Sequence, residues 1–207
     1  MGAEIAPYFF MGKDWTGDGN SIYKTLGASN HTEDERETND YYATDPNALK
    51  ALLDKEEFNT YIWENAVGEG HLAKVLEDRG FDVRASDIID RGYPNTEIID
   101  FLKYEKANDR DIITNPPYKY ALEFAQKSIE ISKPGTKVAM FLKIQFLEGQ
   151  KRREFFNKYP PARVYVFSQR VKCAKNGDFA STGSSAVAYT WFVWEVGQYT
   201  DPVIKWI

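Results

Sequence analysis

The chain has 207 residues, of which 43% are hydrophobic and 28% charged, a length that suits one well-packed domain better than two. No stretch approaches the roughly 20 apolar residues of a membrane-spanning helix. The N-terminus also lacks the basic and apolar segments of a signal peptide, so we expect a cytoplasmic protein without membrane contact. The lone Cys173 excludes a disulfide framework and a cysteine zinc site, and His31 and His71 are interpreted as ordinary polar side chains, so no metal site is expected.

The first part of the chain has no regular pattern. Residues 1–40 are rich in Gly, Asn, Thr and Asp, which predicts an irregular N-terminal arm. From residue 46 the pattern sharpens, because residues 46–57 place apolar side chains on one helical face and Pro46 suits the first turn of a helix.

Strands and helices are then predicted to alternate. Further helices are expected over residues 71–80, 120–133 and 151–159. Strands are expected over residues 60–66, 81–87, 96–101, 110–115, 137–147, 160–168 and 186–196. This alternation predicts an α/β fold with a mostly parallel sheet and helices on both faces. Ligands of such a fold bind at the carboxyl ends of the strands, so those positions are the candidate site.

Candidate ligand-binding residues lie at or after the ends of the first three of these strands. Gly68 and Gly70 stand between a strand and a helix, where glycine permits a tight turn and close approach of a ligand. Asp87 ends the next strand, 17 residues beyond Gly70, and such an acid can accept hydrogen bonds from both hydroxyls of a ribose. Asp100 and Phe101 end the third strand. Helix caps and core packing remain alternative interpretations of these residues.

The glycine loop does not have the pattern of a phosphate site. Both the G-x-x-x-x-G-K-[ST] pattern and a full G-x-G-x-x-G are absent, while Glu64 precedes the glycines and Glu69 lies between them. Carboxylates here would repel a pyrophosphate and attract a cation. S-adenosylmethionine, a nucleoside that carries an ammonium and a sulfonium, fits this loop better than ATP or NAD.

The fourth strand ends in the tetrapeptide NPPY. Pro116 and Pro117 fix two φ angles and remove two N–H donors, so the Asn115 side-chain oxygen and the Pro116 carbonyl remain as acceptors. Two acceptors on a stiff loop suit a planar NH2 group, whose attack on a methyl group they would assist. Tyr118 could stack on the base that carries this group. The alternative interpretation is a proline-rich turn that ends in a surface tyrosine.

With these motifs, the chain from about residue 38 to 196 resembles the S-adenosylmethionine-dependent N6-adenine DNA methyltransferases, in particular short phage and prophage forms. DYYATDP, ENAVGEG, SDI and NPPY resemble the family's motifs, in the order of its gamma group. The resemblance implies a Rossmann-like class I methyltransferase fold with an antiparallel C-terminal strand, in a single catalytic domain over residues 41–207. It also adds Tyr42, Thr44 and Ile88 to the cofactor-binding residues, with Asn115 shared between cofactor and catalysis.

The distribution of charge favours a polyanion as partner. The net charge is −5, but residues 110–207 hold 15 Lys and Arg against 8 Asp and Glu, whereas residues 1–109 hold 11 against 23. A chance distribution of surface charge is the alternative. The gamma group usually has a separate target-recognition domain, for which this chain leaves room only in the arm and in a loop at residues 168–185. The residues expected to contact DNA, besides Tyr118, are Lys151, Arg152, Arg170, Lys172 and Lys175.

The predicted function is therefore methyl transfer from S-adenosylmethionine to N6 of an adenine flipped out of DNA. RNA adenine and protein glutamine are alternative acceptors, because both also present a planar NH2 group. A non-catalytic module that binds cofactor or nucleic acid is a third alternative, which an intact NPPY disfavours. The sequence leaves the recognised bases and the oligomeric state open.

Overall fold

The computed structural model describes residues 42–171, 173–175 and 187–207. The predicted irregular arm and most of the loop at 168–185 lie outside these residues. The first described helix, α2 (Pro46–Leu53), begins as the sequence predicts, with Pro46 in the first turn and Asp45 accepting a hydrogen bond of 2.9 Å from the Asn47 backbone N–H. The apolar face of α2 is buried.

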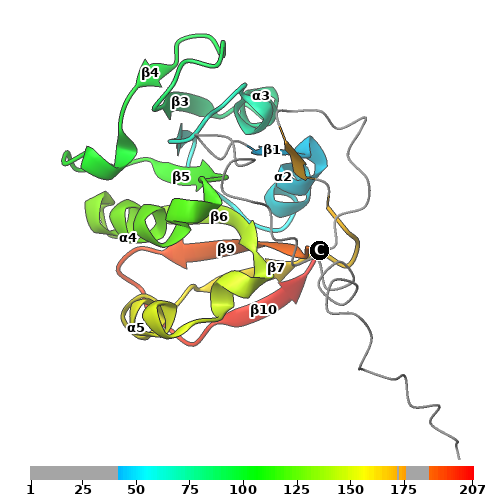
Figure 1. The fold of residues 1–207 in the computed structure, drawn as a ribbon, viewed down its shortest axis with the longest axis vertical. Helices are drawn as coiled ribbons and strands as arrows, with labels where there is room; N and C mark the ends of the chain where they lie inside the picture. The colour runs from blue at the N-terminus through cyan, green and yellow to red at the C-terminus, as the bar shows by residue number, and fades with distance from the viewer. Residues whose placement is uncertain (1–41, 172, 176–186) are drawn as a thin grey trace, which may run out of the picture. The chain divides into compact units, whose positions relative to one another are not determined.

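A large sheet forms the centre of the described part. Its eight strands lie in the order β10-β7-β9-β6-β5-β2-β3-β4 (Figure 1). Their bounds are β2 Tyr61–Glu64, β3 Asp82–Asp87, β4 Glu97–Ile98, β5 Asp111–Thr114, β6 Lys137–Lys143, β7 Arg163–Val166, β9 Tyr189–Glu195 and β10 Val203–Trp206. The strands from β4 to β6 pair in parallel, and β9 runs antiparallel to both β6 and β7. The predicted mostly parallel sheet with an antiparallel strand near the C-terminus is confirmed.

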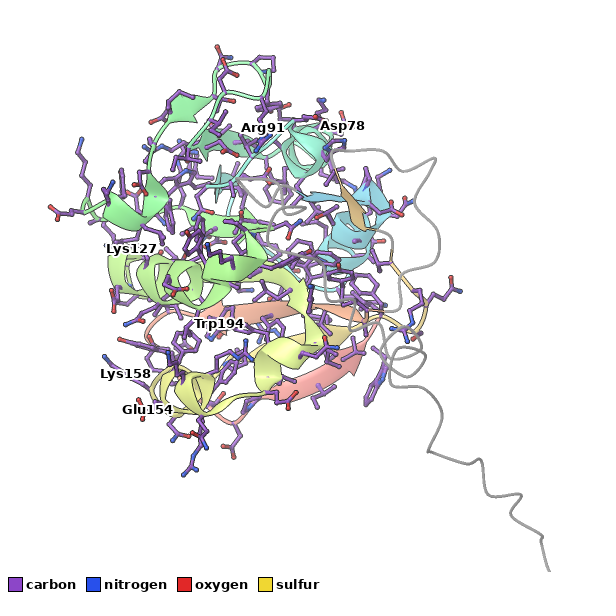
Figure 2. The ribbon with its side chains drawn as sticks, viewed as in Figure 1. Asp78, Arg91, Lys127, Glu154, Lys158 and Trp194 are labelled. Carbon is purple, nitrogen blue, oxygen red and sulfur yellow. The ribbon has the colours of Figure 1, made fainter. Side chains whose placement is uncertain are left out.

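Helices cover both faces of this sheet, because its strands bury side chains in both directions. In β6, Val138, Met140 and Leu142 enter one hydrophobic cluster, while Ala139 and Phe141 enter the other. The first cluster lies under α4 (Ala121–Ile131) and α5 (Gln150–Lys158), and the second under α2 and α3 (His71–Asp78). Trp194 of β9 is labelled in Figure 2. Its indole N–H donates a hydrogen bond of 3.0 Å to the carbonyl of Tyr159, the residue just after α5. None of the helices in the described part is long and apolar enough to cross a membrane.

Two predicted strand boundaries were wrong, and one strand of the large sheet was missed. The strand expected at 96–101 shortens to β4, because the chain turns at Asp100 into the short 3-10 helix η2 (Phe101–Lys103). The strand expected at 137–147 ends at Lys143, where η4 (Ile144–Leu147) buries Phe146 against Phe192 with ring centroids 5.4 Å apart. The final strand β10 was missed, because all four of its residues are exposed and no burial pattern marks it. It pairs in parallel with β7.

A second, two-stranded sheet joins segments far apart in the sequence. The backbone of β1 (Tyr42–Thr44) pairs antiparallel with β8 (Cys173–Lys175), so that Thr44 lies opposite Cys173. The segment before α2 and the loop expected to contact the target are therefore linked by main-chain hydrogen bonds, an arrangement that sequence reasoning missed.

Candidate active site

The candidate site lies where the order of the strands reverses. From β2 the chain passes through α3 to β3 on one side, and from β5 it passes through α4 to β6 on the other. The carboxyl ends of the neighbouring strands β2 and β5 therefore carry loops that diverge, and this is the position at which doubly wound sheets bind nucleotides. Glu64 is the last residue of β2, and Asn115 follows the last residue of β5.

The loop between β2 and α3 is shaped by its glycines. Gly68 and Gly70 have φ angles of 56° and 78°, in the left-handed region that suits glycine. A Cβ atom on Gly70 would lie 2.0 Å from Cδ2 of Tyr93, a buried ring that packs on the loop. Gly68 donates its backbone N–H to Asp87 Oδ2 at 2.9 Å. The loop and the predicted ribose acid therefore hold each other in place.

Asp87 and its neighbours lie where a nucleoside is expected. The other oxygen of Asp87 accepts a hydrogen bond from the Ile89 backbone at 3.2 Å. Ile88 is 56% exposed, which leaves an apolar side chain beside the carboxylate for contact with a base. Asp100 is half-buried and paired with Lys103, whose Nζ lies 2.8 Å from Oδ2. Phe101 is 2% exposed and packs on the rings of Trp63 and Phe124, as its core alternative implied. Its ring belongs to the hydrophobic core in this structure, so a cofactor contact of this residue would come from its backbone.

Several buried polar atoms at or just after the ends of strands have no hydrogen-bond partner among the described residues. They are Thr44 Oγ1, Glu64 Oε2, both amide atoms of Asn65, and Thr114 Oγ1. Thr44, Glu64 and Thr114 each end a strand, and Asn65 follows β2. An unsatisfied buried polar group costs about 1–3 kcal/mol, so the unsatisfied atoms of Glu64 and Asn65, which are neighbours at the end of β2, favour a polar ligand there. Hydroxyl, carboxylate and amide groups together fit the ammonium and carboxylate of an amino acid moiety, as S-adenosylmethionine carries.

The buried carboxyl of Glu64 has a shifted pKa. Burial raises the pKa of Glu64 well above its usual value, and the nearby Asp87 raises this pKa further. A hydrogen bond from the Ala73 backbone acts in the opposite direction. A cationic ligand would instead favour the ionised form. The protonation state of Glu64 should therefore depend on the charge of the ligand that binds beside it.

The NPPY segment forms a stiff loop after β5. Pro116 is buried, while Asn115, Pro117 and Tyr118 are partly buried. Tyr118 begins the 3-10 helix η3 (Tyr118–Tyr120), which the Pro117 carbonyl closes by accepting the Tyr120 N–H at 2.9 Å. The predicted roles of these four residues in catalysis stay predictions.

Two residues beside Tyr118 were missed from the sequence. The ring of Tyr189 lies 5.8 Å from that of Tyr118, and the ammonium of Lys143 lies 5.0 Å from the centroid of the Tyr118 ring. Lys143 ends β6, the strand next to β5, so the rule that ligands bind at strand ends could have found it. Tyr189 begins β9 opposite Lys143, a pairing that only the sheet register reveals.

Tyr118 also lines a cavity of about 470 Å3. It lies between the start of α4 and the start of α5, and Lys151 and Arg152 line it together with Tyr118. Two of the predicted DNA-contacting residues are therefore near the NPPY segment. Arg170 is exposed and does not line this cavity. Lys172 lies outside the described residues, and so do the side chains of Tyr42 and Lys175.

Comparisons with known proteins identify the fold. No protein-family model matches the chain, and no curated protein matches it. Among solved structures, a Listeria monocytogenes protein assigned as a class I S-adenosylmethionine-dependent methyltransferase aligns with a TM-score of 0.57 and 13% identity. That alignment covers 82% of this chain and 66% of the Listeria protein. A Thermotoga maritima S-adenosylmethionine-dependent O-methyltransferase aligns with a TM-score of 0.50 and 16% identity, over 81% of this chain and 71% of that one.

A modification subunit assigned to a type I restriction enzyme of Vibrio vulnificus aligns with a TM-score of 0.54 and 12% identity. It matches 91% of this chain but only 50% of its own length, so this chain spans about half of that subunit. At these identities the similarity shows the fold alone. The chain has the Rossmann-like class I methyltransferase fold that the sequence predicted.

Proposed function

We propose that this protein transfers a methyl group from S-adenosylmethionine to the exocyclic N6 of adenine in DNA. The observation that carries the proposal is the juxtaposition of NPPY at the end of β5 with the unsatisfied polar atoms at the end of β2, its neighbour in the sheet. The first segment suits a planar NH2 acceptor, and the second suits the amino acid end of the cofactor.

Each residue has a separate task in this proposal. When bound, S-adenosylmethionine supplies an activated methyl group on a sulfonium. Asp87 accepts hydrogen bonds from the ribose hydroxyls, and Ile88 covers the base. Thr44, Glu64 and Asn65 hold the amino acid end, while Tyr42, Asp100 and the backbone of Phe101 complete the cofactor site as the resemblance implies.

The acceptor side uses fixed dipoles. The Asn115 side-chain oxygen and the Pro116 carbonyl accept hydrogen bonds from the NH2 group, which stabilises the positive charge that builds on nitrogen as it attacks. Pro117 stiffens the loop, and Tyr118 holds the extruded base by stacking, worth about 1–3 kcal/mol. An asparagine amide cannot hold the proton that the nitrogen loses, so this proton leaves to water.

DNA is favoured as the substrate by the basic second half of the chain and by the cationic residues around Tyr118. Arg170, Lys172 and Lys175 extend this basic character into the loop at 168–185. A glutamine methyltransferase would need no such charge. RNA adenine remains the second candidate, because phosphate contacts alone do not separate RNA from DNA.

Transfer of a tritiated methyl group to DNA, RNA and protein in parallel tests the proposal. Label in adenine of DNA, recovered as the N6-methyl derivative, is the expected result. Label confined to RNA or to protein glutamine would move the acceptor assignment while keeping the enzyme class. Cofactor binding without transfer to any of the three would support a binding module instead.

A further inference from the structure

The cavity beside Tyr118 is lined mainly by two helix starts and by cationic side chains. Its charged lining residues are Lys119, Lys151 and Arg152 against the single acid Glu123. Three positive charges against one in a space of about 470 Å3 make this a positively charged cavity. A volume of about 300–1,000 Å3 is typical of sites for small ligands or parts of larger ones.

The three cationic side chains of the cavity differ in their contacts with the rest of the protein. Arg152 donates its Nε–H to the Glu148 carbonyl, and its guanidinium lies 5.4 Å from the centroid of the Phe146 ring. The side chain is therefore oriented before any ligand binds, which reduces the entropy cost of binding. Gly149 makes this approach possible, since its φ is 112° and a Cβ atom there would lie 3.1 Å from Nη2 of Arg152. Lys151 is exposed, and Lys119 lies 5.4 Å from the ring centroid of Tyr120.

Aromatic and apolar side chains accompany these cations. Tyr118 and Phe146 line the cavity, and Tyr120 and Leu147, which are 42% and 46% exposed, adjoin lining residues in sequence. Interleaved rings and cations are typical of surfaces that follow a single nucleic acid strand, where rings stack on bases and cations contact phosphates. The first turns of α4 and α5 also lack a side-chain cap, so their backbone N–H groups add positive potential to a cavity that the side chains already define.

We propose that this cavity binds a backbone phosphate of the DNA strand that carries the target adenine, next to the nucleotide that Tyr118 holds. The inference rests on the proposed function and adds a substrate subsite to it. Arg152 and Lys151 contact the phosphate, and Lys119 approaches it from the side of α4. The flipped strand is thereby held next to the reacting base, which positions the adenine without reading its neighbours' sequence.

The test uses a matched pair of double variants in α5. Lys151→Ala with Arg152→Ala removes two cations that line the cavity. Arg153→Ala with Lys158→Ala removes two exposed cations from the same helix that do not line it, and Lys158 is labelled in Figure 2. Both changes have the same effect on net charge and similar effects on helix propensity, so they separate local binding from general electrostatics.

Binding of a fluorescent adenine-containing single-stranded DNA to the full-length protein is measured by anisotropy at several salt concentrations. We expect the cavity variant to lower the slope of log K against log salt by about 0.7 for each phosphate that it no longer binds, and the control variant to change the slope by much less. Cofactor affinity, measured by calorimetry, is expected to stay unchanged in both, which also shows that both variants fold.

Two results would overturn the inference: equal slopes for the two variants, or no binding of the oligonucleotide by the wild-type protein. The outcome is separable from that of the proposed function. If the cavity variant alone changes the slope but no adenine is methylated, the phosphate subsite stands and the acceptor assignment fails. If adenine is methylated and the slopes are equal, the subsite fails and the function stands.

Discussion

Asp87 holds the glycine loop and is also the residue expected to bind a ribose. One oxygen accepts the Gly68 N–H at 2.9 Å and the other accepts the Ile89 N–H at 3.2 Å. Each oxygen has a second lone pair for a ligand hydroxyl. The same carboxylate therefore fixes the loop and serves the expected ligand.

Asp87→Ala is predicted to weaken S-adenosylmethionine binding by about 1–3 kcal/mol, the scale of the charge-assisted hydrogen bonds that this change removes. Calorimetry with the purified variant measures this change. Asp78→Ala, at the exposed C-terminal end of α3 and labelled in Figure 2, is the control and should bind the cofactor normally. Unchanged affinity in a folded Asp87→Ala protein would remove Asp87 from the site.

Glu64 is predicted to make binding of the proposed cofactor dependent on pH. Burial and the nearby Asp87 raise the pKa of Glu64, so the unliganded protein holds its proton to a higher pH than an exposed glutamate would. A bound cation stabilises the carboxylate, so binding expels this proton. Affinity should therefore increase as the pH rises from about 4.5, the usual glutamate range, until it passes the raised pKa.

Calorimetry of S-adenosylmethionine binding in buffers with different ionisation enthalpies measures the number of protons released. We expect release for the wild type, and little release with a flatter pH dependence for Glu64→Gln. The thioether product S-adenosylhomocysteine keeps the ammonium that Glu64 is proposed to hold, so its binding should also release protons from the wild type. Equal proton counts for the wild type and Glu64→Gln would contradict this role.

At the scale of elements, a buried ionic network joins the opposite, amino-terminal ends of the strands. Glu56, whose side chain is 5% exposed, accepts hydrogen bonds from Lys137 at 2.6 Å, Arg163 at 2.5 and 2.8 Å, and the Tyr165 hydroxyl at 2.6 Å. Burial acts to raise the pKa of Glu56, but the hydrogen bonds from Arg163, Lys137 and Tyr165 outweigh it and lower this pKa. The network fixes the chain after α2 to β6 and β7.

Glu56→Ala is predicted to destabilise the fold by about 3–5 kcal/mol at neutral pH, because it leaves the Arg163 and Lys137 charges without their buried partner. A lowered folded pKa means that the Glu56 contribution is complete above the unfolded pKa of about 4.5 and is lost as the pH falls through the folded value. Urea unfolding of the wild type and the variant should show a gap that is large at pH 7 and narrows in acid. A gap of the same size at both pH values would contradict the linkage.

The elements also show how far sequence patterns reach. The apolar face of α2 was sufficient to predict this helix, because burial on one side imposes a period on the sequence. The alternation of residues 81–87 predicted β3, although β3 buries the consecutive residues Ala85 and Ser86. The edge strand β10 has no buried face, and β1 and β8 are three residues each and form only by meeting one another. Their formation depends on tertiary pairing rather than on local pattern.

The same limit applies to the candidate site. Glu64, Asp87 and Asn115 were chosen as candidates because each lies at or directly after the end of a predicted strand, and parallel strands bring such positions to one edge of the sheet. Phe101 was assigned to the cofactor site by the same rule, yet its ring faces the core, because strand position alone does not give the direction of a side chain. Arg152 and Tyr118 line the same cavity because of the position of α5 in the fold, and no local sequence pattern predicts that position.

At the scale of the whole molecule, the sheet places the two tasks on adjacent strands. The proposed cofactor residues come mainly from β2, β3 and their loops, in the acidic half of the chain, and the proposed acceptor residues come from the end of β5 and the basic half that follows. This division suits a reaction between a cationic small molecule and a polyanion, because each partner meets charge of the opposite sign.

The acceptor half predicts a graded series at NPPY. Tyr118→Phe should keep most activity because the ring face remains, whereas Tyr118→Ala should weaken the hold on the base and lower turnover. Asn115→Asp should keep partial activity, since a carboxylate oxygen also accepts hydrogen bonds from NH2. Single-turnover rates with saturating cofactor rank the series, and equal rates for Tyr118→Ala and Tyr118→Phe would argue against stacking.

The account depends most directly on Asn115, and single-turnover methyl transfer to adenine-containing DNA by the wild type and Asn115→Ala tests it. The account predicts N6-methyladenine from the wild type and a rate about 10²–10³-fold lower from the variant, the scale for loss of one preorganised dipole. Cofactor affinity should change little, because the main cofactor contacts lie on β2 and β3. Methylation of adenine by Asn115→Ala at the wild-type rate would contradict the account, since NPPY would then be only a stiff turn.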